Sequence, residues 1–185
     1  HVGATVRVLV SEVKKVGTRV RIVVSRASAD LVKELFRLEV PEIADGVIEV
    51  KRIVRDPGYR TKVAVLSHDA KIDCQGACVG VRGSRIRAIT DELNGEKVDI
   101  VKWSDSLEEL VVNALKPAEI DIDNIFPDEE TRSVLVLVEE KQLSLAIGKR
   151  GQNVRLAWRL CGWAIDIKTR AEYEAEDLAS RMREE

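Results

Sequence analysis

The chain has 185 residues, which is enough for one ordinary domain or two small ones. Hydrophobic residues make up 45% and charged residues 34%, which is the balance of a globular protein, and no apolar run approaches the roughly 18 residues of a membrane span. We therefore expect a cytoplasmic protein without membrane association. The net charge of −2 argues against a nucleic-acid partner until its distribution along the chain is considered.

The first 26 residues predict two strands of a hairpin. "TVRVLVSEV" and "TRVRIVVSR" both alternate between apolar and polar residues. Two strands alone are marginally stable in water, so this hairpin needs partners from outside residues 1–26.

The next segments predict a helix, two strands, a short helix, a loop, a helix and a strand. "ADLVKELF" has helical periodicity, and "VIEVKRIVR" and "KVAVLSH" flank the tight-turn residues "DPGY". After the loop "GVRG", apolar residues at helical spacing precede a glycine at the position of a helix C-cap, Gly95. In the following "KVDIV", we expect Val98 and Ile100 to face the same side of a sheet.

The second half repeats this order. Ser106 and Glu109 form a capping box for "SLEELVVNAL", and the strands "EIDIDNIF" and "SVLVLV" follow. Apolar helical residues precede the loop "GKRG", after which a helix runs to Gly162 and a strand covers "AIDIK". The acidic stretch "AEYEAEDLASRMREE" reads as a terminal helix or linker.

The two Gly-x-x-Gly loops belong to an internal duplication. Aligned on the glycines, eight positions agree once one residue is dropped near the helix end. In the first copy they are Gly80, Arg82, Gly83, Arg87, Leu93, Gly95, Asp99 and Ile100, and in the second Gly148, Arg150, Gly151, Arg155, Leu160, Gly162, Asp166 and Ile167.

Both loops lie in windows that contain basic residues and no acid. Residues 74–90 contain three arginines, and residues 141–165 contain two lysines and three arginines. A solvated helix face is the ordinary explanation for such a run, but its recurrence at matching repeat positions favours an anionic ligand.

Three phosphate-binding motifs share glycine-rich loops that open a helix, and two of them fail here. A nucleotide P-loop needs G-x-x-x-x-G-K-[S/T], which neither copy has. A dinucleotide fold needs G-x-G-x-x-G after a strand, whereas helical residues such as Leu143 and Ile147 precede Gly148. The third is a short loop between two helices that is pressed against a nucleic-acid backbone.

This pattern resembles the KH domain, whose GXXG loop clamps about four nucleotides of a single strand. The leading helix and hairpin resemble its type II, prokaryotic arrangement. Segments such as "LVKELFRLEVPEIADGVIEV", "NGEKVDIVKW" and "QLSLAIGKRGQNVRLAWRLCGWAIDIK" further resemble the NusA family of bacterial transcription elongation and termination factors, in which an S1 barrel precedes two KH domains.

The resemblance implies an α+β fold with two tandem type II KH domains, each a three-stranded sheet with helices on one face, preceded by a partial S1 (OB-like β-barrel) hairpin. The implied limits are 1–27 for the closing hairpin of a truncated S1 domain, 28–103 and 104–170 for the KH domains, and 171–185 for the acidic tail. "KWSDSLEEL" leaves no flexible tether between them, so we expect a rigid pair that binds one extended RNA.

The predicted RNA-binding residues are the two loops and the polar residues that follow them. They are Gly80, Val81, Arg82, Gly83, Ser84, Arg85, Arg87, Gly148, Lys149, Arg150, Gly151, Gln152, Asn153 and Arg155. Val81 departs from the proline that relatives tend to have, and Glu139 and Glu140 are acids that we expect to weaken phosphate attraction near the second loop. Trp103, Trp158 and Trp163 are expected to be core anchors rather than base stackers.

We expect no enzyme, no cofactor and no metal. The carboxylates do not pair at acid/base spacing, and the best metal candidate, His68 with Cys74 and Cys78, fits better as residues beside a helix start. Together with Cys161 these thiols form an odd set without disulfide spacing, which suits a reducing compartment.

The expected partners are single-stranded nascent RNA and, by the resemblance, RNA polymerase, other Nus factors and a ribosomal protein. We expect a monomer. A KH-type ribosomal or ribosome-assembly protein and a protein-binding scaffold are the alternatives.

Overall fold

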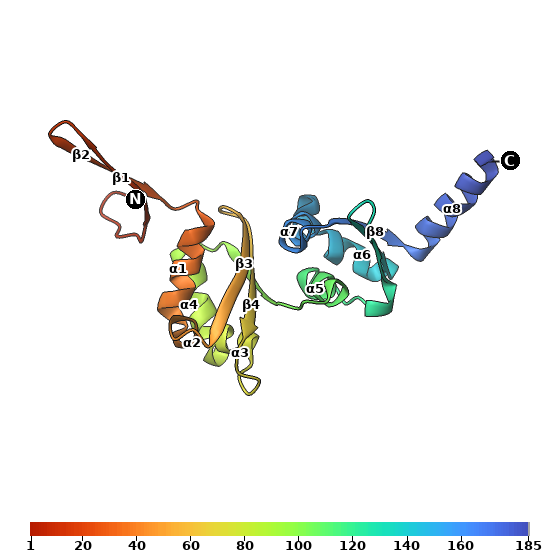
Figure 1. Cartoon of the computed structure of the whole chain (residues 1–185), viewed down its shortest axis with the longest axis horizontal. Helices are drawn as coiled ribbons and strands as arrows, with labels where there is room; N and C mark the ends of the chain where they lie inside the picture. Colours follow the sequence, from red (N-terminus) through yellow and green to blue (C-terminus); the bar gives the residue numbers. More distant parts are fainter. Residues whose placement is uncertain (185) are drawn as a thin grey trace. The chain divides into compact units, whose positions relative to one another are not determined.

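The computed structural model describes residues 1–184, and the chain divides into two compact units, His1–Val101 and Lys102–Glu185 (Figure 1). Within the described residues, every helix is too short or too polar to cross a membrane.

The first unit contains a hairpin followed by a helix-and-sheet body. Its elements are β1 (Leu9–Val16), β2 (Arg19–Ser25), α1 (Ala29–Glu39), α2 (Pro41–Ala44), β3 (Ile48–Asp56), β4 (Arg60–Ser67), α3 (Cys74–Val79), the 3-10 turn η1 (Val81–Gly83), α4 (Ser84–Glu92) and β5 (Lys97–Lys102).

Strands β3, β4 and β5 form a three-stranded sheet in that order. β3 and β4 are antiparallel, with Ile48 opposite Ser67 and Asp56 opposite Arg60. The tight turn predicted at "DPGY" joins them, because the Tyr59 amide donates to the Asp56 carbonyl (3.0 Å) and Gly58 has a φ of 81°. β4 lies between β3 and β5 and so occupies the centre of the sheet.

Helices α1, α3 and α4 contribute their apolar faces to one core with this sheet. Leu35 and Phe36 of α1, Val63 of β4, Cys78 of α3 and Ile89 of α4 are at most 1% exposed and belong to a single cluster. The predicted inward residues of β5, Val98 and Ile100, pack against it. Burial of apolar side chains in this layer holds the helices in place, at roughly 25 cal/mol per Å² of area removed from water.

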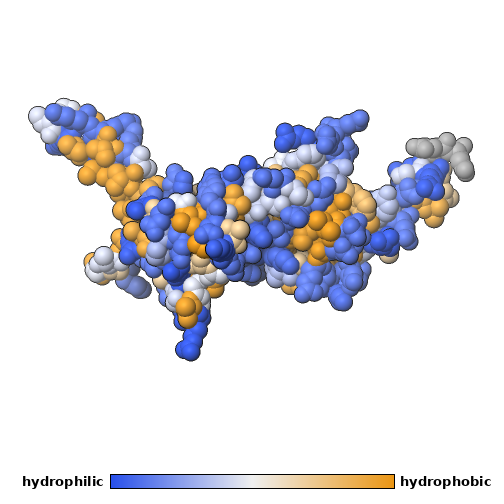
Figure 2. Space-filling view, turned by 60° about the horizontal axis from the view of Figure 1, so that its bottom comes forward, coloured by the Kyte–Doolittle hydropathy of each residue, from blue (hydrophilic) through white to orange (hydrophobic). Residues whose placement is uncertain are grey.

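The hairpin β1–β2 leaves most of its apolar side chains exposed. Six valine and isoleucine side chains of the two strands are at least 50% exposed: Val10, Val13, Val16, Val20, Ile22 and Val24. Figure 2 shows this apolar surface on the projecting hairpin. Its base is attached to α4, because Arg26 Nη2 donates to the Glu92 carbonyl oxygen (2.6 Å) and the Arg7 amide donates to Glu92 Oε1 (2.8 Å). The Arg7 amide, together with Arg26, lowers the pKa of the Glu92 carboxyl.

The second unit repeats the element order of the first body. Its elements are α5 (Leu107–Ala114), the 3-10 turn η2 (Ile122–Asn124), β6 (Ile125–Asp128), β7 (Ser133–Val138), α6 (Glu140–Ile147), the 3-10 turn η3 (Lys149–Gly151), α7 (Gln152–Cys161), β8 (Ala164–Thr169) and α8 (Arg170–Glu184).

Strands β6, β7 and β8 form the second three-stranded sheet, again with the middle strand of the sequence at the centre. β6 pairs antiparallel with β7, and β7 pairs parallel with β8 from Ser133 opposite Ala164 to Val138 opposite Thr169. Val134 and Val136 of β7 and Leu156 and Leu160 of α7 are fully buried. Helix α8 begins with a reciprocal cap, in which Thr169 Oγ1 accepts from the Glu172 amide and Glu172 Oε2 accepts from the Thr169 amide.

The predicted α+β fold of two helix-and-sheet domains is confirmed, with one local error. The strand expected over "EIDIDNIF" begins only at Ile125, because Ile122–Asn124 form a 3-10 turn. The Asp121 carboxylate accepts from the Asp123 amide (3.0 Å) and so draws this backbone out of an extended conformation.

Candidate nucleic-acid interface

The two Gly-x-x-Gly loops have the same backbone conformation. Gly80 and Gly148 have φ/ψ angles of 76°/173° and 77°/170°, and Gly83 and Gly151 have 73°/19° and 69°/16°. Between them Arg82 (53°/29°) and Arg150 (55°/28°) are non-glycine residues in the left-handed region. The duplication seen in the sequence is therefore a duplication of three-dimensional shape.

The first glycine of each loop is required by both its angles and its surroundings. A ψ near 170° with positive φ is essentially restricted to glycine. In addition, a Cβ at Gly80 would lie 2.7 Å from Arg85 Cγ, and one at Gly148 would lie 2.7 Å from Asn153 Cβ. The start of each loop thus passes directly against the helix that follows it.

Each loop opens a helix whose first amides receive no side-chain cap. Gly83 is the N-cap of α4 and Gly151 is the N-cap of α7, and neither position has a capping hydrogen bond from a side chain. The first turn of an α-helix presents unpaired N–H groups and the positive end of the helix dipole, which stabilise an anionic oxygen. Both helix starts are suited to a phosphate group.

Five exposed basic side chains surround these helix starts. Arg82 and Arg87 belong to the first loop and helix, and Lys149, Arg150 and Arg155 belong to the second. Arg87 Nη2 also donates to the Arg82 carbonyl (3.2 Å), which ties the first helix turn back to its loop. Cations and helix amides of each unit therefore point to the same class of ligand, a polyanion.

Two predicted contact residues have a different environment. Asn153 is fully buried, and its Nδ2 donates to the carbonyls of Leu115 and Ala146 (both 3.0 Å). Arg85 is partly buried, and its Nη1 donates to Glu42 Oε2 (2.9 Å) and to the Ala77 carbonyl (2.6 Å). The burial of Asn153 conflicts with its predicted RNA contact, and the hydrogen bonds of Arg85 hold its guanidinium against α2 and α3.

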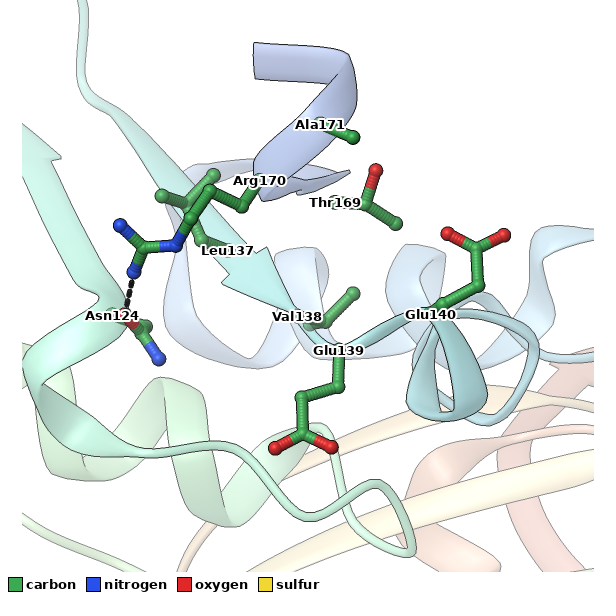
Figure 3. Close-up of a pocket in the computed structure, with 8 residues that line it drawn as sticks. All are labelled: Asn124, Leu137, Val138, Glu139, Glu140, Thr169, Arg170 and Ala171. Carbon is green, nitrogen blue, oxygen red and sulfur yellow. Dashed lines mark hydrogen bonds between the residues drawn. The ribbon is translucent and has the colours of Figure 1, made fainter. Parts of the chain in front are cut away.

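Glu139 and Glu140 lie at the opposite end of α6 from the second loop. Figure 3 shows both at the start of α6, on the edge of a hollow of about 460 Å³ that Asn124, Thr169 and Arg170 also line. The eight residues of α6 separate them from Gly148 by about 12 Å at 1.5 Å per residue. This distance exceeds the Debye length of about 8 Å at physiological salt, so screening reduces the effect that these acids have on phosphate attraction at the loop.

The tryptophans occupy more exposed positions than expected. Trp158 is 51% exposed, because the inward face of α7 is already filled by Leu156, Ala157, Leu160 and Cys161. Its expected role as a core anchor is wrong. Trp163 is partly buried and lies 5.6 Å from the Arg132 guanidinium in a cation–π contact.

The residues weighed for a metal site do not converge. His68 is exposed and its Nε2 lies 2.9 Å from Glu49 Oε2, whereas Cys74 and Cys78 are buried in the core. Burial raises the pKa of the Cys78 thiol to about 12, which keeps it protonated. Over residues 1–184, no group of three or more His, Cys, Asp or Glu side chains is arranged to hold a metal ion.

A helix, Gly-x-x-Gly loop and helix packed on a three-stranded sheet define a KH domain, a single-stranded nucleic-acid-binding module, and the chain contains two of them. Residues 26–103 match the NusA-like first KH domain, and residues 107–175 match the NusA-like second KH domain. The chain belongs to the NusA family.

Individual relatives agree with this assignment. The transcription termination/antitermination protein NusA of Borreliella burgdorferi is 46% identical over 180 residues, which cover 97% of this chain and 37% of that protein. The protein of the same name from Bacillus subtilis is 46% identical over 179 residues, which cover 97% of this chain and 47% of that protein. The chain thus spans less than half the length of these relatives.

The crystal structure of APE1850 shares the fold. It matches 75% of this chain and 96% of its own length with a TM-score of 0.54, and the sequences are 22% identical.

Proposed function

We propose that this chain binds single-stranded RNA through its two Gly-x-x-Gly loops, as the RNA-binding part of a transcription elongation factor that acts on pausing, termination and antitermination by RNA polymerase. The observation that carries the proposal is the matched backbone of the two loops, each opening an uncapped helix among exposed cations. The relatives' name, transcription termination/antitermination protein, supports the process.

In the proposed mode each loop holds one stretch of RNA backbone. Phosphate oxygens accept from the first amides of α4 and α7, and Gly83 and Gly151, the N-caps of these helices, have no side chain to obstruct that approach. Arg82 binds phosphates at the first loop, and Lys149 and Arg150 bind them at the second. Val81, Ser84 and Gln152 contact the sugar or base.

We further propose that one strand engages both loops. Two weak sites on one chain raise each other's effective concentration, and the combined affinity exceeds that of a single site by a factor on the order of 10² to 10⁴ when both engage. The proposed domain limits are 28–103 and 104–170, with 1–27 as part of an S1 domain. RNA polymerase and other Nus factors are the proposed protein partners of a monomer.

The test is a titration of labelled single-stranded RNA, followed by fluorescence anisotropy, with charge reversals at each loop. We expect Val81→Asp with Arg82→Asp, and separately Lys149→Asp with Arg150→Asp, to weaken binding by about tenfold or more each, because charge-assisted hydrogen bonds contribute about 1.5–3 kcal/mol. Unchanged affinity in both variants would contradict the proposal.

A matched control separates local contacts from net charge. Lys33 and Arg37 are exposed on α1, and their replacement by aspartate changes the net charge as much as the second-loop reversal does. This variant should bind RNA within about threefold of the parent, since exposed charges away from the ligand are screened. If the parent binds no single-stranded RNA even at low salt, a protein-binding scaffold becomes the better explanation.

A further inference from the structure

The residue five positions after the first glycine of each loop reaches back to the helix before the loop. Arg85 Nη1 donates to the Ala77 carbonyl (2.6 Å), and Asn153 Nδ2 donates to the Leu145 carbonyl (3.3 Å). Ala77 and Leu145 both stand three residues before the first glycine of their loop. Two chemically unlike side chains therefore make the same connection across the two loops.

Each of these side chains also reaches a second segment of its own unit. Arg85 Nη1 pairs with Glu42 Oε2 of α2 at 2.9 Å, and Asn153 Nδ2 donates to the Leu115 carbonyl at the C-cap of α5 at 3.0 Å. The helix before the sheet, the helix before the loop and the helix after the loop thus meet at one side chain in each unit.

The backbone between these contacts needs external support. Arg82 and Arg150 adopt left-handed angles, which cost about 1–2 kcal/mol for a non-glycine residue. Such conformations persist only where the surrounding structure determines them. Arg85 and Asn153 provide that support from directly beneath Gly80 and Gly148, at contact distances that leave no room for a Cβ.

We infer that Arg85 and Asn153 are positioning residues that hold the two loops in their binding conformation, and that neither binds RNA. The inference rests on the proposed function. The two supports differ in kind, because the Arg85–Glu42 pair is solvent-accessible, with side chains 29% and 30% exposed, whereas Asn153 is fully buried. The first loop is therefore supported by an ion pair that salt screens, and the second by a buried amide that salt does not reach.

The experiment is a charge swap at the first loop, made in a background with Lys149→Asp and Arg150→Asp so that the first loop dominates RNA binding. The variants are Arg85→Glu, Glu42→Arg and the double exchange, titrated with single-stranded RNA. We expect each single change to weaken binding by about fivefold or more. The double exchange should recover part of this loss, because it re-forms the ion pair while a carboxylate at position 85 cannot donate to the Ala77 carbonyl.

The Glu42→Arg variant distinguishes an RNA-contact role of Arg85 from a positioning role, because the two roles predict opposite changes in RNA affinity. It adds positive charge and releases Arg85 from its partner, so affinity would rise if Arg85 were an RNA contact. A positioning role predicts a fall, because two arginines then repel each other beneath the loop. A double exchange that binds as weakly as Arg85→Glu, or an Arg85→Glu variant that binds like the parent, overturns the inference.

The Arg37–Glu34 pair of α1 is the matched control. Its ion pair spans 2.7 Å on an exposed helix face, and neither residue contacts the loop. Glu34→Arg adds the same charge as Glu42→Arg and should leave binding unchanged or slightly stronger. Thermal unfolding of every variant identifies any change that acts through global instability.

A second readout does not depend on RNA. Hydrogen exchange of the amides of residues 81–84 should accelerate in both single variants and slow again in the double exchange, without reaching the parent rate, because the hydrogen bond to the Ala77 carbonyl is not restored. If the charge-reversal variants of both loops bind RNA as the parent does, the proposed function fails. The exchange rates then still decide whether Arg85 holds the loop.

Discussion

Gly148 and Asn153 are packed so closely that a Cβ on the glycine would lie 2.7 Å from the asparagine Cβ and 2.9 Å from its amide nitrogen. Gly151, three residues after Gly148, also has a positive φ of 69°, but nothing lies within 4 Å of a Cβ built there. The two glycines of one loop are therefore required for different reasons, and they form a natural pair for mutation.

We expect Gly148→Ala to destabilise the second domain far more than Gly151→Ala. The left-handed angles of Gly151 cost alanine about 1–2 kcal/mol, whereas Gly148→Ala adds a backbone collision to angles that only glycine adopts readily, for a total of about 3 kcal/mol or more. Urea unfolding of the two variants measures the difference. If both variants lose the same free energy of unfolding, the loop must relax around the methyl group added at position 148.

Glu96 is expected to be among the most sensitive side chains of the first domain. It is 1% exposed and accepts from Arg55 Nη2 (3.0 Å), Thr61 Oγ1 (2.6 Å) and the Gly58 amide (2.6 Å). Glu96→Gln places an amide group among donors and leaves the buried Arg55 guanidinium without its counter-charge, which should cost about 3–5 kcal/mol. Denaturant unfolding checks this, with the exposed Glu34→Gln as a control that should cost less than about 0.5 kcal/mol.

Lys62 should make stability depend on alkaline pH. Burial lowers the pKa of its ammonium group from 10.5 to about 8, against the opposing effect of Asp99 at 2.7 Å, while Arg60 and Lys97 add to the lowering. Between these two values the unfolded chain binds a proton that the folded chain has released. The contribution of Lys62 to stability therefore rises from pH 8 to pH 10.5 and is least favourable below pH 8.

The pH effect is isolated by comparing the parent with a Lys62→Met variant. The difference between their unfolding free energies should change by about 3 kcal/mol across this window, at 1.36 kcal/mol per pKa unit. Lys33→Met removes an exposed ammonium group without touching the buried cluster and serves as the control. A difference that stays constant across the window would mean that the ion pair with Asp99 offsets the effect of burial on the pKa of Lys62.

RNA binding should weaken steeply with salt. If the five exposed cations at the loops each neutralise one phosphate, log K should fall against log salt with a slope of about −3.5, at about −0.7 per phosphate for a single strand. Replacing both Lys149 and Arg150 by glutamine removes two of these cations and should make the slope less negative by about 1.4. A parent slope near zero would indicate that backbone amides rather than side-chain charges dominate the contact.

Local patterns in the sequence were sufficient for most of the architecture. The helix of "SLEELVVNAL", the strands "SVLVLV" and "KVDIV" and the loops themselves follow from periodicity and glycine placement, and each lies where it was predicted. These signals act within a few residues along the chain, so they can be read without knowledge of the tertiary structure.

Features that the sequence did not indicate depend on contacts between distant residues or on the order in which residues fill a helix face. Nothing in the sequence around Arg85 indicates Glu42, which stands 43 residues earlier, and nothing around Asn153 indicates the carbonyl of Leu115. Both side chains follow a loop in an acid-free basic window, so both were predicted to contact RNA. Trp158 was misplaced because helical periodicity alone does not show that smaller residues already fill the inward face of α7.

The agreement of the two loops has an evolutionary consequence. Their backbone shape depends on two glycines, one left-handed arginine and the supporting side chain of Arg85 or Asn153, while the residue after the first glycine is Val81 in one copy and Lys149 in the other. After the ancestral gene segment was duplicated, each copy was free to change its charge without refolding. Selection could then adjust the RNA affinity of the two loops separately, because the position after the first glycine does not take part in holding the loop backbone.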